Sequence, residues 1–205
     1  MINKGVIFGY SGHAFVIIDM LLSNNYVLEG YYDTSLQKNN PFNLPYLGKD
    51  DAATLDKNYH AFVCIGNNLI RASIFQKLKE RDISYPPLFH KHSSTSNYAT
   101  VGNGTVVMAG AVINPLAKVG EGVICNTSSV IEHECVINNY AHIAPGAVLA
   151  GNVEVGERSF IGANAVIRQG IVIGSDVVIG AGAVVVKHVA NGSTVYGNPA
   201  LAQIK

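Results

Sequence analysis

Residues 155–184 read VGERSF, IGANAV, IRQGIV, IGSDVV and IGAGAV, successive hexapeptides that each begin with valine or isoleucine. Followed in both directions, the same six-residue register runs from Val101 to Val185, and every position in it is aliphatic except Cys125. A mostly small residue stands four places after each of these. A period of six fits neither an α-helix nor an alternating strand. It is typical of a parallel β-helix, whose short strands and tight turns stack coil upon coil.

The repeat also predicts which residues lie side by side. Three hexapeptides make one triangular coil of 18 residues, so the register predicts about five coils. Because stacked strands lie about 4.8 Å apart, residues 18 apart in the sequence should lie directly above one another. His133 then shares a surface column with Gly151, and Ala163 shares another with Ala181.

The N-terminal part, residues 1–84, has a different pattern. Short apolar runs alternate with segments whose apolar residues recur at helical spacing. Strands are predicted at 6–8, 26–32 and 61–65, and helices at 13–22 and 69–81. Strands separated by helices favour a parallel sheet with right-handed crossovers, so we expect a Rossmann-like βαβαβ domain. The stretch between the second and third strands is expected to be a loop, rich in asparagine and proline over 39–45.

Tyr85-Pro86-Pro87 interrupts the α/β pattern and predicts a junction. We therefore expect an α/β domain over 1–84, a linker and entry segment over 85–100, and a β-helix domain with a closing segment over 101–205.

Composition narrows the class of protein. The 205 residues carry 14 Lys plus Arg and 14 Asp plus Glu, so the basic excess of a nucleic-acid-binding protein is missing. Apolar runs stay below the roughly 18 residues of a membrane span, and the first residues do not read as a signal peptide. Three widely spaced cysteines form no disulfide framework. We expect a cytoplasmic protein without nucleic-acid partners or membrane insertion.

Several short motifs accompany the repeats. They are Gly9-Tyr10-Ser11-Gly12-His13, Asp33, Ile65-Gly66-Asn67-Asn68 with Arg71, Asn126-Thr127-Ser128-Ser129, Glu132-His133-Glu134-Cys135 and Val195-Tyr196-Gly197-Asn198-Pro199-Ala200. With the repeats, they resemble the hexapeptide-repeat acyltransferases, and most narrowly the bacterial nucleotide-aminosugar N-acetyltransferases of the bacillosamine type. The related sialic acid O-acetyltransferases share this layout. The resemblance implies a left-handed β-helix, acetyl-CoA as co-substrate, and a homotrimer with active sites between subunits.

Acetyl transfer to an amine needs a base for the proton and a donor for the developing oxyanion. His133 lies between two inward positions, so its side chain should face outward beside the Glu134 carboxylate. The N–H of Gly151, one coil above, would face the thioester carbonyl without a side chain in the way. The resemblance implies that His133 is the base with Glu134 as its acidic helper, and that the amine attacks acetyl-CoA directly. The alternative is a solvated histidine in a turn.

The acetyl-CoA site is assigned with help from the resemblance. His142 comes nine residues after His133, on another side of the coil, so the two could meet only across a subunit boundary. The resemblance implies that His142 contacts acetyl-CoA, together with Gly151. Ala163 and Ala181 would leave a groove for the pantetheine arm, although small residues are also normal in this fold.

Thiol and metal chemistry are not expected. Cys125 and Cys135 occupy the two inward-facing repeat positions, which favours packing over nucleophilic catalysis. His90 and His92 have no further ligand at a suitable spacing, so no metal site is predicted.

The glycine-rich segment at residues 9–13 joins a strand to a helix whose N-terminus can bind an anion. It departs from the full G-x-G-x-x-G pattern, which argues against NAD. Asp33 ends the next strand, where an acidic residue typically meets a ribose or base. The resemblance implies a UDP-sugar site, and Thr34 stands in place of the family's usual second acidic residue. The implied substrate-binding residues are Ser11, Gly12, His13, Asp33, Gly66 and Asn126.

The sequence thus predicts an acetyl-CoA-dependent N-acetyltransferase acting on the 4-amino group of a UDP-linked amino-dideoxy sugar, for bacterial surface glycan synthesis or protein glycosylation. An O-acetyltransferase of sialic acid or another sugar is one alternative. A non-catalytic scaffold that binds a nucleotide sugar is another. GDP- and dTDP-linked sugars also remain open, because Asp33 and Thr34 do not identify a base.

Overall fold

The computed structural model describes residues 3–49 and 55–202. Contacts divide the chain into two compact units, Met1–Leu88 and Phe89–Lys205. Within the described residues, no helix has both the length and the apolar character needed to cross a membrane.

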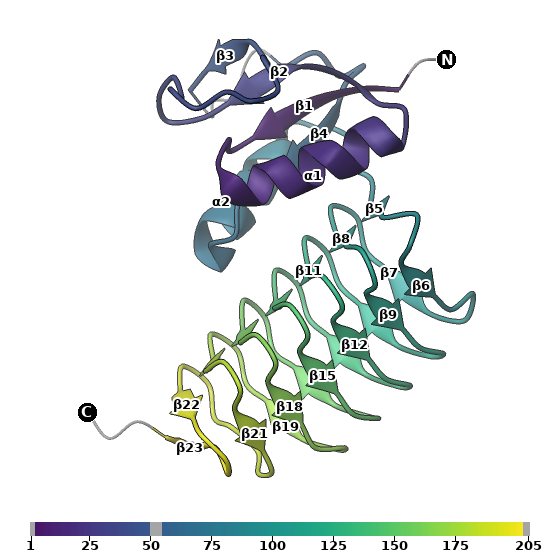
Figure 1. Cartoon of the computed structure of the whole chain (residues 1–205), viewed down its shortest axis with the longest axis vertical. Helices are drawn as coiled ribbons and strands as arrows, with labels where there is room; N and C mark the ends of the chain where they lie inside the picture. The colour runs from purple at the N-terminus through teal and green to yellow at the C-terminus, as the bar shows by residue number, and fades with distance from the viewer. Residues whose placement is uncertain (1–2, 50–54, 203–205) are drawn as a thin grey trace. The chain divides into compact units, whose positions relative to one another are not determined.

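The N-terminal unit is an α/β domain built on one parallel sheet, in the order β3-β2-β1-β4 (Figure 1). Its strands are β1 (Lys4–Phe8), β2 (Val27–Tyr32), β3 (Tyr46–Gly48) and β4 (His60–Val63), and its helices are α1 (Gly12–Ser23) and α2 (Asn68–Glu80). The parallel sheet and the two helices confirm the predicted fold class. Strand β3 lies directly after the predicted loop and was not expected, because its three residues are too few to show a strand pattern.

The turn from β1 into α1 depends on one glycine. Gly9 has φ +88°, a conformation that residues with a side chain rarely adopt. A Cβ atom added there would also lie 2.5 Å from Cγ1 of Ile65. The buried residues of β1 and of one α1 face anchor the two ends of this turn. The N-terminus of α1 is thereby held at the carboxyl edge of the sheet.

The second unit is a parallel β-helix whose strands form three sheets (Figure 1). Sheet 1 contains β5 (Leu88–Phe89), β8 (Val106–Val107), β11 (Ile124–Cys125), β14 (His142–Ile143), β17 (Phe160–Ile161), β20 (Val178–Ile179), β22 (Thr194–Tyr196) and the antiparallel β23 (Leu201–Ala202). Sheet 2 contains β6 (Ser94–Thr95), β9 (Val112–Ile113), β12 (Val130–Ile131), β15 (Val148–Leu149), β18 (Val166–Ile167) and β21 (Val184–Val185). Sheet 3 contains β7 (Thr100–Val101), β10 (Lys118–Val119), β13 (Val136–Ile137), β16 (Glu154–Val155) and β19 (Val172–Ile173).

The strand register confirms the predicted columns. Val130 pairs with Val148, and Val148 pairs with Val166, so each residue lies against the one 18 positions later. The inward positions form one continuous apolar core along the β-helix. Cys125 and Cys135 belong to this core, as predicted from their places in the repeat.

The β-helix is longer than predicted and begins before residue 101. Sheet 2 has six strands among the described residues, which gives six coils in place of the predicted five. The additional coil contains β5 and β6, so this part of the 85–100 segment is not a linker. Phe89 and Thr95 keep the six-residue spacing to Val101, but neither is aliphatic, which hid the first repeats from the pattern.

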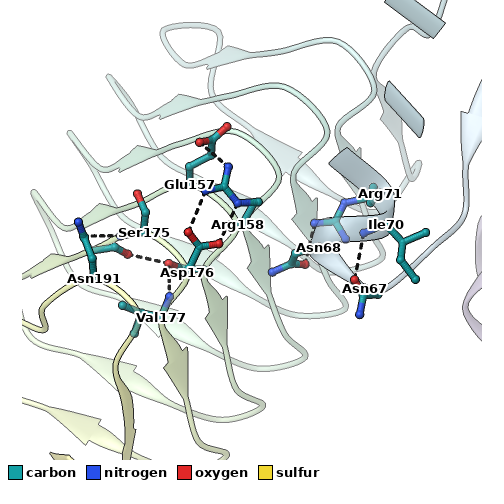
Figure 2. A network of polar contacts seen from close by, with 12 residues as sticks. Asn67, Asn68, Ile70, Arg71, Glu157, Arg158, Ser175, Asp176, Val177 and Asn191 are labelled. Atoms are coloured by element: carbon teal, nitrogen blue, oxygen red, sulfur yellow. Dashed lines mark hydrogen bonds and ion pairs between the residues drawn. The ribbon is translucent and has the colours of Figure 1, made fainter. Parts of the chain in front are cut away.

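The turns bring successive coils very close together. A Cβ added at Gly162 would lie 2.6 Å from backbone atoms of the next coil, so glycine is required there. At another corner, Arg158 forms a bidentate ion pair with Asp176, 18 residues later, with both N–O distances at 2.8 Å (Figure 2). The hydrogen bonds and charge of Arg158 lower the pKa of the Asp176 carboxyl.

Candidate functional site

His133 and Glu134 form a pair on the turn between β12 and β13. The two exposed side chains meet through Nδ1 of His133 and Oε2 of Glu134, 3.1 Å apart. An ionised carboxylate can only accept hydrogen bonds, so the Nδ1–H of His133 is the donor. The neutral ring then carries its lone pair on Nε2. This arrangement suits a general base whose orientation is set by a carboxylate.

Gly151 lies directly against the His133 ring. A Cβ at this glycine would be 2.5 Å from Cε1 and 2.6 Å from Nε2 of His133, so a larger residue would displace the imidazole. The carbonyl of Gly151 accepts a hydrogen bond from Gly170. The N–H of Gly151 donates none to the described residues. The Gly151 backbone therefore lies next to Nε2 of His133.

His142 is paired with Asn126, a contact that sequence reasoning missed. Oδ1 of Asn126 accepts the N–H of Thr127 at 2.8 Å, which leaves its amide Nδ2 to donate to Nε2 of His142 at 3.0 Å. The rings of His142 and Phe160 also pack at 83° with their centroids 5.0 Å apart, and His142 is only 8% exposed. His142 lies in β14 and Asn126 directly follows β11, both strands of sheet 1, whereas His133 follows β12 of sheet 2. The two histidines therefore lie on different sides of the coil.

Two alanines are predicted to lie along the pantetheine arm of acetyl-CoA. In the structure they stack one above the other, as expected. Ala163 and Ala181 occupy the turn that follows sheet 1, and the N–H of Asn164 and of Gly182 link the turn to the coil before it. Ala163 is half-buried and Ala181 is exposed. They form a surface column of small side chains on the β-helix.

The N-terminal unit contains a pocket of about 440 Å³ at the carboxyl ends of its strands. Three of the predicted substrate-binding residues line it: Ser11, Asp33 and Gly66. Gly12 and His13 stand outside this lining. The pocket also includes Tyr10 and Asn67 from the quoted motifs, Thr34 next to Asp33, and two residues that sequence reasoning did not assign to the site, Gln37 and Ile70.

Two helices begin at this pocket. Ser11 immediately precedes α1, and the side chain of Asn67 caps α2 by accepting the N–H of Ile70 at 3.0 Å (Figure 2). Both of these N-cap residues line the pocket. Since helix N-termini favour negative charge, the pocket is suited to an anion such as a diphosphate.

Asp33 holds the glycine-rich turn in place. Its Oδ2 accepts the N–H of Tyr10 at 2.9 Å, and its Oδ1 accepts the N–H of Thr34 at 2.6 Å. The carboxylate therefore supports two segments of the pocket wall, in addition to facing the pocket. This structural part of its role was absent from the sequence prediction.

Arg71 supports the part of the pocket wall that follows β4. It is 1% exposed, and its Nη1 donates to the carbonyls of Ile65 and Gly66 at 3.1 Å. Its Nη2 donates to Oδ1 of Asn68 at 2.9 Å (Figure 2). Burial lowers the pKa of the guanidinium to about 9. Burial, together with the Arg71 charge, also lowers the pKa of His13 to about 4, which keeps that imidazole neutral.

The cysteines are poor candidates for nucleophiles. Burial raises the pKa of all three thiols, that of Cys125 to about 12. The thiolate is the reactive form, so these side chains are unreactive near neutral pH. Across the described part of the chain, no cluster of three or more His, Cys, Asp or Glu side chains could hold a metal ion.

Comparisons with known proteins agree with both units. Residues 4–78 match the PglD N-terminal domain, and residues 152–187 match the bacterial transferase hexapeptide model of six repeats. The acetyltransferase domain of PglB from Neisseria gonorrhoeae FA1090 is 33% identical with a TM-score of 0.93, covering 98% of this chain and 100% of that chain. PerB from Caulobacter crescentus, solved with CoA and GDP-perosamine, is 32% identical with a TM-score of 0.90, covering 99% of this chain and 98% of that one.

A curated relative is the GDP-perosamine N-acetyltransferase of Escherichia coli O157:H7. It is 31% identical over 143 residues, which are 70% of this chain and 59% of that protein. The α/β unit and the hexapeptide coils define a hexapeptide-repeat transferase. More narrowly, the chain belongs to the bacillosamine-type family of sugar acetyltransferases, which combine a PglD N-terminal domain with hexapeptide repeats.

The low pKa of His13 predicts a pH-dependent stability. An unfolded histidine binds its proton below about pH 6.5, whereas folded His13 does so only below about pH 4. The unfolded state therefore gains protons first, and the free energy of unfolding should fall as the pH drops from 6.5 to 4. Denaturant unfolding of the wild type and of His13→Gln should show a smaller pH effect in the variant. An NMR titration with His13 changing charge near pH 6.5 would contradict this assignment.

Proposed function

We propose that the protein transfers the acetyl group of acetyl-CoA to the 4-amino group of a nucleotide-linked amino-dideoxy sugar. The observation that carries this proposal is the His133–Glu134 pair with Gly151 against its ring. UDP is the nucleotide implied by the family resemblance. GDP is the second candidate, because relatives of the chain are described as GDP-perosamine N-acetyltransferases.

The arrangement of these residues supports a direct transfer. The amine nitrogen attacks the thioester carbonyl carbon while Nε2 of His133 takes a proton from the nitrogen. The Gly151 N–H stabilises the oxyanion that forms on the carbonyl oxygen. Collapse of the tetrahedral intermediate breaks the carbon–sulfur bond and releases CoA, leaving an amide. Glu134 keeps the imidazole in the tautomer that has its lone pair on Nε2.

The two units supply complementary parts of this reaction. The pocket of the N-terminal unit, with Ser11, Asp33 and Gly66, would take the nucleotide diphosphate. On the β-helix, His142, Ala163 and Ala181 would lie along the CoA arm. We propose that Gly12 and His13 shape the turn beneath the nucleotide, and that Asn126 orients His142 in addition to any contact with the sugar.

We further propose that the protein is a homotrimer. The outward positions of sheet 2 form a column of partly exposed valines, and such an apolar face is typical of a subunit contact. These residues are Val112, Val130, Val148, Val166 and Val184. Because His133 and His142 lie on different sides of one coil, a neighbouring copy would bring them to a common site.

Acetyl-CoA and nucleotide sugars are intracellular metabolites, so we place the reaction in the cytoplasm, in the synthesis of a bacterial surface glycan or a protein-linked glycan. An O-acetyltransferase of a free sugar such as sialic acid would have no use for the nucleotide pocket. A scaffold would bind nucleotide sugars without consuming acetyl-CoA. Both alternatives therefore differ from the proposal in a measurable way.

A thiol-release assay tests the proposed reaction. Acetyl-CoA is mixed with UDP-, GDP- or dTDP-linked 4-amino-4,6-dideoxy sugars, or with free sialic acid. We expect CoA release and amide formation with the UDP-linked amino sugar, weaker turnover with the other nucleotides, and none with sialic acid. Turnover of sialic acid alone would support the O-acetyltransferase, and binding without release would support the scaffold.

His133→Ala should lower kcat by about 100-fold or more, because general bases typically contribute factors of this size. Glu134→Gln should cause a smaller loss, since the imidazole remains. The defect of His133→Ala should shrink at high pH, where more of the amine is already deprotonated. Cys135→Ala is the control, because its thiol lies in the core beside this turn, and most activity should remain. Full activity in His133→Ala would refute the proposed base.

The trimer is tested by sedimentation equilibrium and by mixing inactive variants. At micromolar concentration we expect three chains per particle. If sites combine residues of two copies, hybrids assembled from His133→Ala and His142→Ala chains should recover part of the activity that each variant lacks alone. A fully active monomer would rule out the shared site.

A further inference from the structure

A second pocket lies on the β-helix next to the proposed base. Its volume is about 370 Å³, within the range of small-molecule sites. Its lining includes Tyr98, Thr100, Leu116, Lys118, Glu134 and Val136. Tyr98, Leu116 and Val136 make it largely apolar, and Lys118 and Glu134 are its charged members. None of the residues assigned to the nucleotide or to acetyl-CoA lines it.

Two of its residues are unusual for their positions. Tyr98, Leu116 and Glu134 are 18 residues apart and share one column of turns. Leu116 has φ +66°, and Glu134 in the next coil has φ +60°; of the other residues at positive φ in this β-helix, most are glycine, asparagine or aspartate. Leu116 is nevertheless 58% exposed, and Tyr98 is 77% exposed. A strained leucine that gains little burial is typical of a functional surface.

Glu134 connects this pocket to the proposed base. Its side chain lines the pocket, and its Oε2 accepts the hydrogen bond from Nδ1 of His133. The lone-pair nitrogen Nε2 lies against Gly151, in the following coil. Tyr98 and Leu116 belong to the preceding coils. The pocket thus extends from the proposed base in the direction opposite to Gly151.

This placement separates the two substrates. In the proposed reaction, the thioester carbonyl lies at the Gly151 N–H, so the donor occupies the side of the later coils. The acceptor must reach the same base nitrogen without overlapping the donor. The side of the earlier coils, with this pocket, is therefore open to the acceptor.

We propose that the pocket binds the deoxygenated carbon of the acceptor sugar, and that Leu116 and Tyr98 determine specificity for 6-deoxy amino sugars. The inference rests on the proposed function, which already names an amino-dideoxy sugar, and adds the pocket and the residues that would select it. A methyl group at C6 gains contact with the leucine and tyrosine side chains. A hydroxymethyl group would bring a hydroxyl against the same apolar surface at a cost in binding. Lys118 and Glu134 remain available to the polar groups of the sugar.

The test compares two acceptors that differ only at C6, a nucleotide-linked 4-amino-4,6-dideoxyhexose and its 6-hydroxy counterpart. For the wild type, we expect kcat/KM to favour the deoxy acceptor by about tenfold or more, because the apolar pocket leaves the added hydroxyl without a partner. Leu116→Gly should reduce this preference to about threefold or less, with the KM for acetyl-CoA unchanged. Glycine adopts φ +66° readily, so the unfolding midpoint should be maintained.

Two further variants complete the design. Tyr98→Ala should weaken the preference in the same way, and because its side chain is mostly exposed, the fold should tolerate the change. Asn25→Gly is the matched control, since it places a glycine at φ 60° in the N-terminal unit and should leave the preference unchanged. A preference that survives in both Leu116→Gly and Tyr98→Ala would overturn the proposal.

Other outcomes identify what failed. Loss of the oligomer in Leu116→Gly with an unchanged preference would make the pocket a subunit contact and refute the sugar site. Equal turnover of both acceptors by the wild type would refute the pocket alone and leave the N-acetyltransferase intact. Absence of turnover with either acceptor would refute the proposed function and this inference with it.

Discussion

The close stacking of one coil on the next is the constraint on which the rest of the β-helix depends. Backbone hydrogen bonds link each coil to its neighbours, and the space is so small that Gly162 leaves no room for a Cβ atom. Inward apolar residues fill the interior along the whole length. Under this constraint a distance in sequence becomes a distance in space, since residues 18 apart must touch. His133 and Gly151 become neighbours for that reason alone, before any catalytic requirement is considered.

Periodicity therefore made part of the site predictable. The outward direction of His133, its proximity to Glu134 and the position of Gly151 all follow from the six-residue register. The pairing of Asn126 with His142 does not, because it depends on the orientation of one amide, set by the Thr127 N–H. The first coil escaped prediction because Phe89 and Thr95 replace aliphatic residues there. Strand β3 escaped because its three residues are too few to show a pattern.

The N-terminal pocket shows a different limit of sequence reasoning. A motif can indicate that Asp33 lies at the site, but not that its two oxygens hold Tyr10 and Thr34. These bonds position the walls that a nucleotide would contact. Arg71 similarly acts through the carbonyls of Ile65 and Gly66. Arg71 falls within the helix predicted at 69–81, and only the fold places its guanidinium against the carbonyls of that loop. Residues that shape a pocket from behind leave a weaker signal in a sequence than residues that line it.

The same stacking that fixes the base also limits how the site can change. A substitution at Gly151 displaces the His133 ring, and one at Gly162 separates two coils. Tyr98 and Leu116, which precede Glu134 in its turn column, have more freedom, because their side chains are exposed and only the backbone conformation at Leu116 is constrained. Catalytic geometry can then stay constant while the column is altered to suit another acceptor. A β-helix thus separates the residues that must be preserved for chemistry from those that can vary with the substrate. Leu116, with its unfavourable positive φ, belongs to the residues that can vary with the substrate.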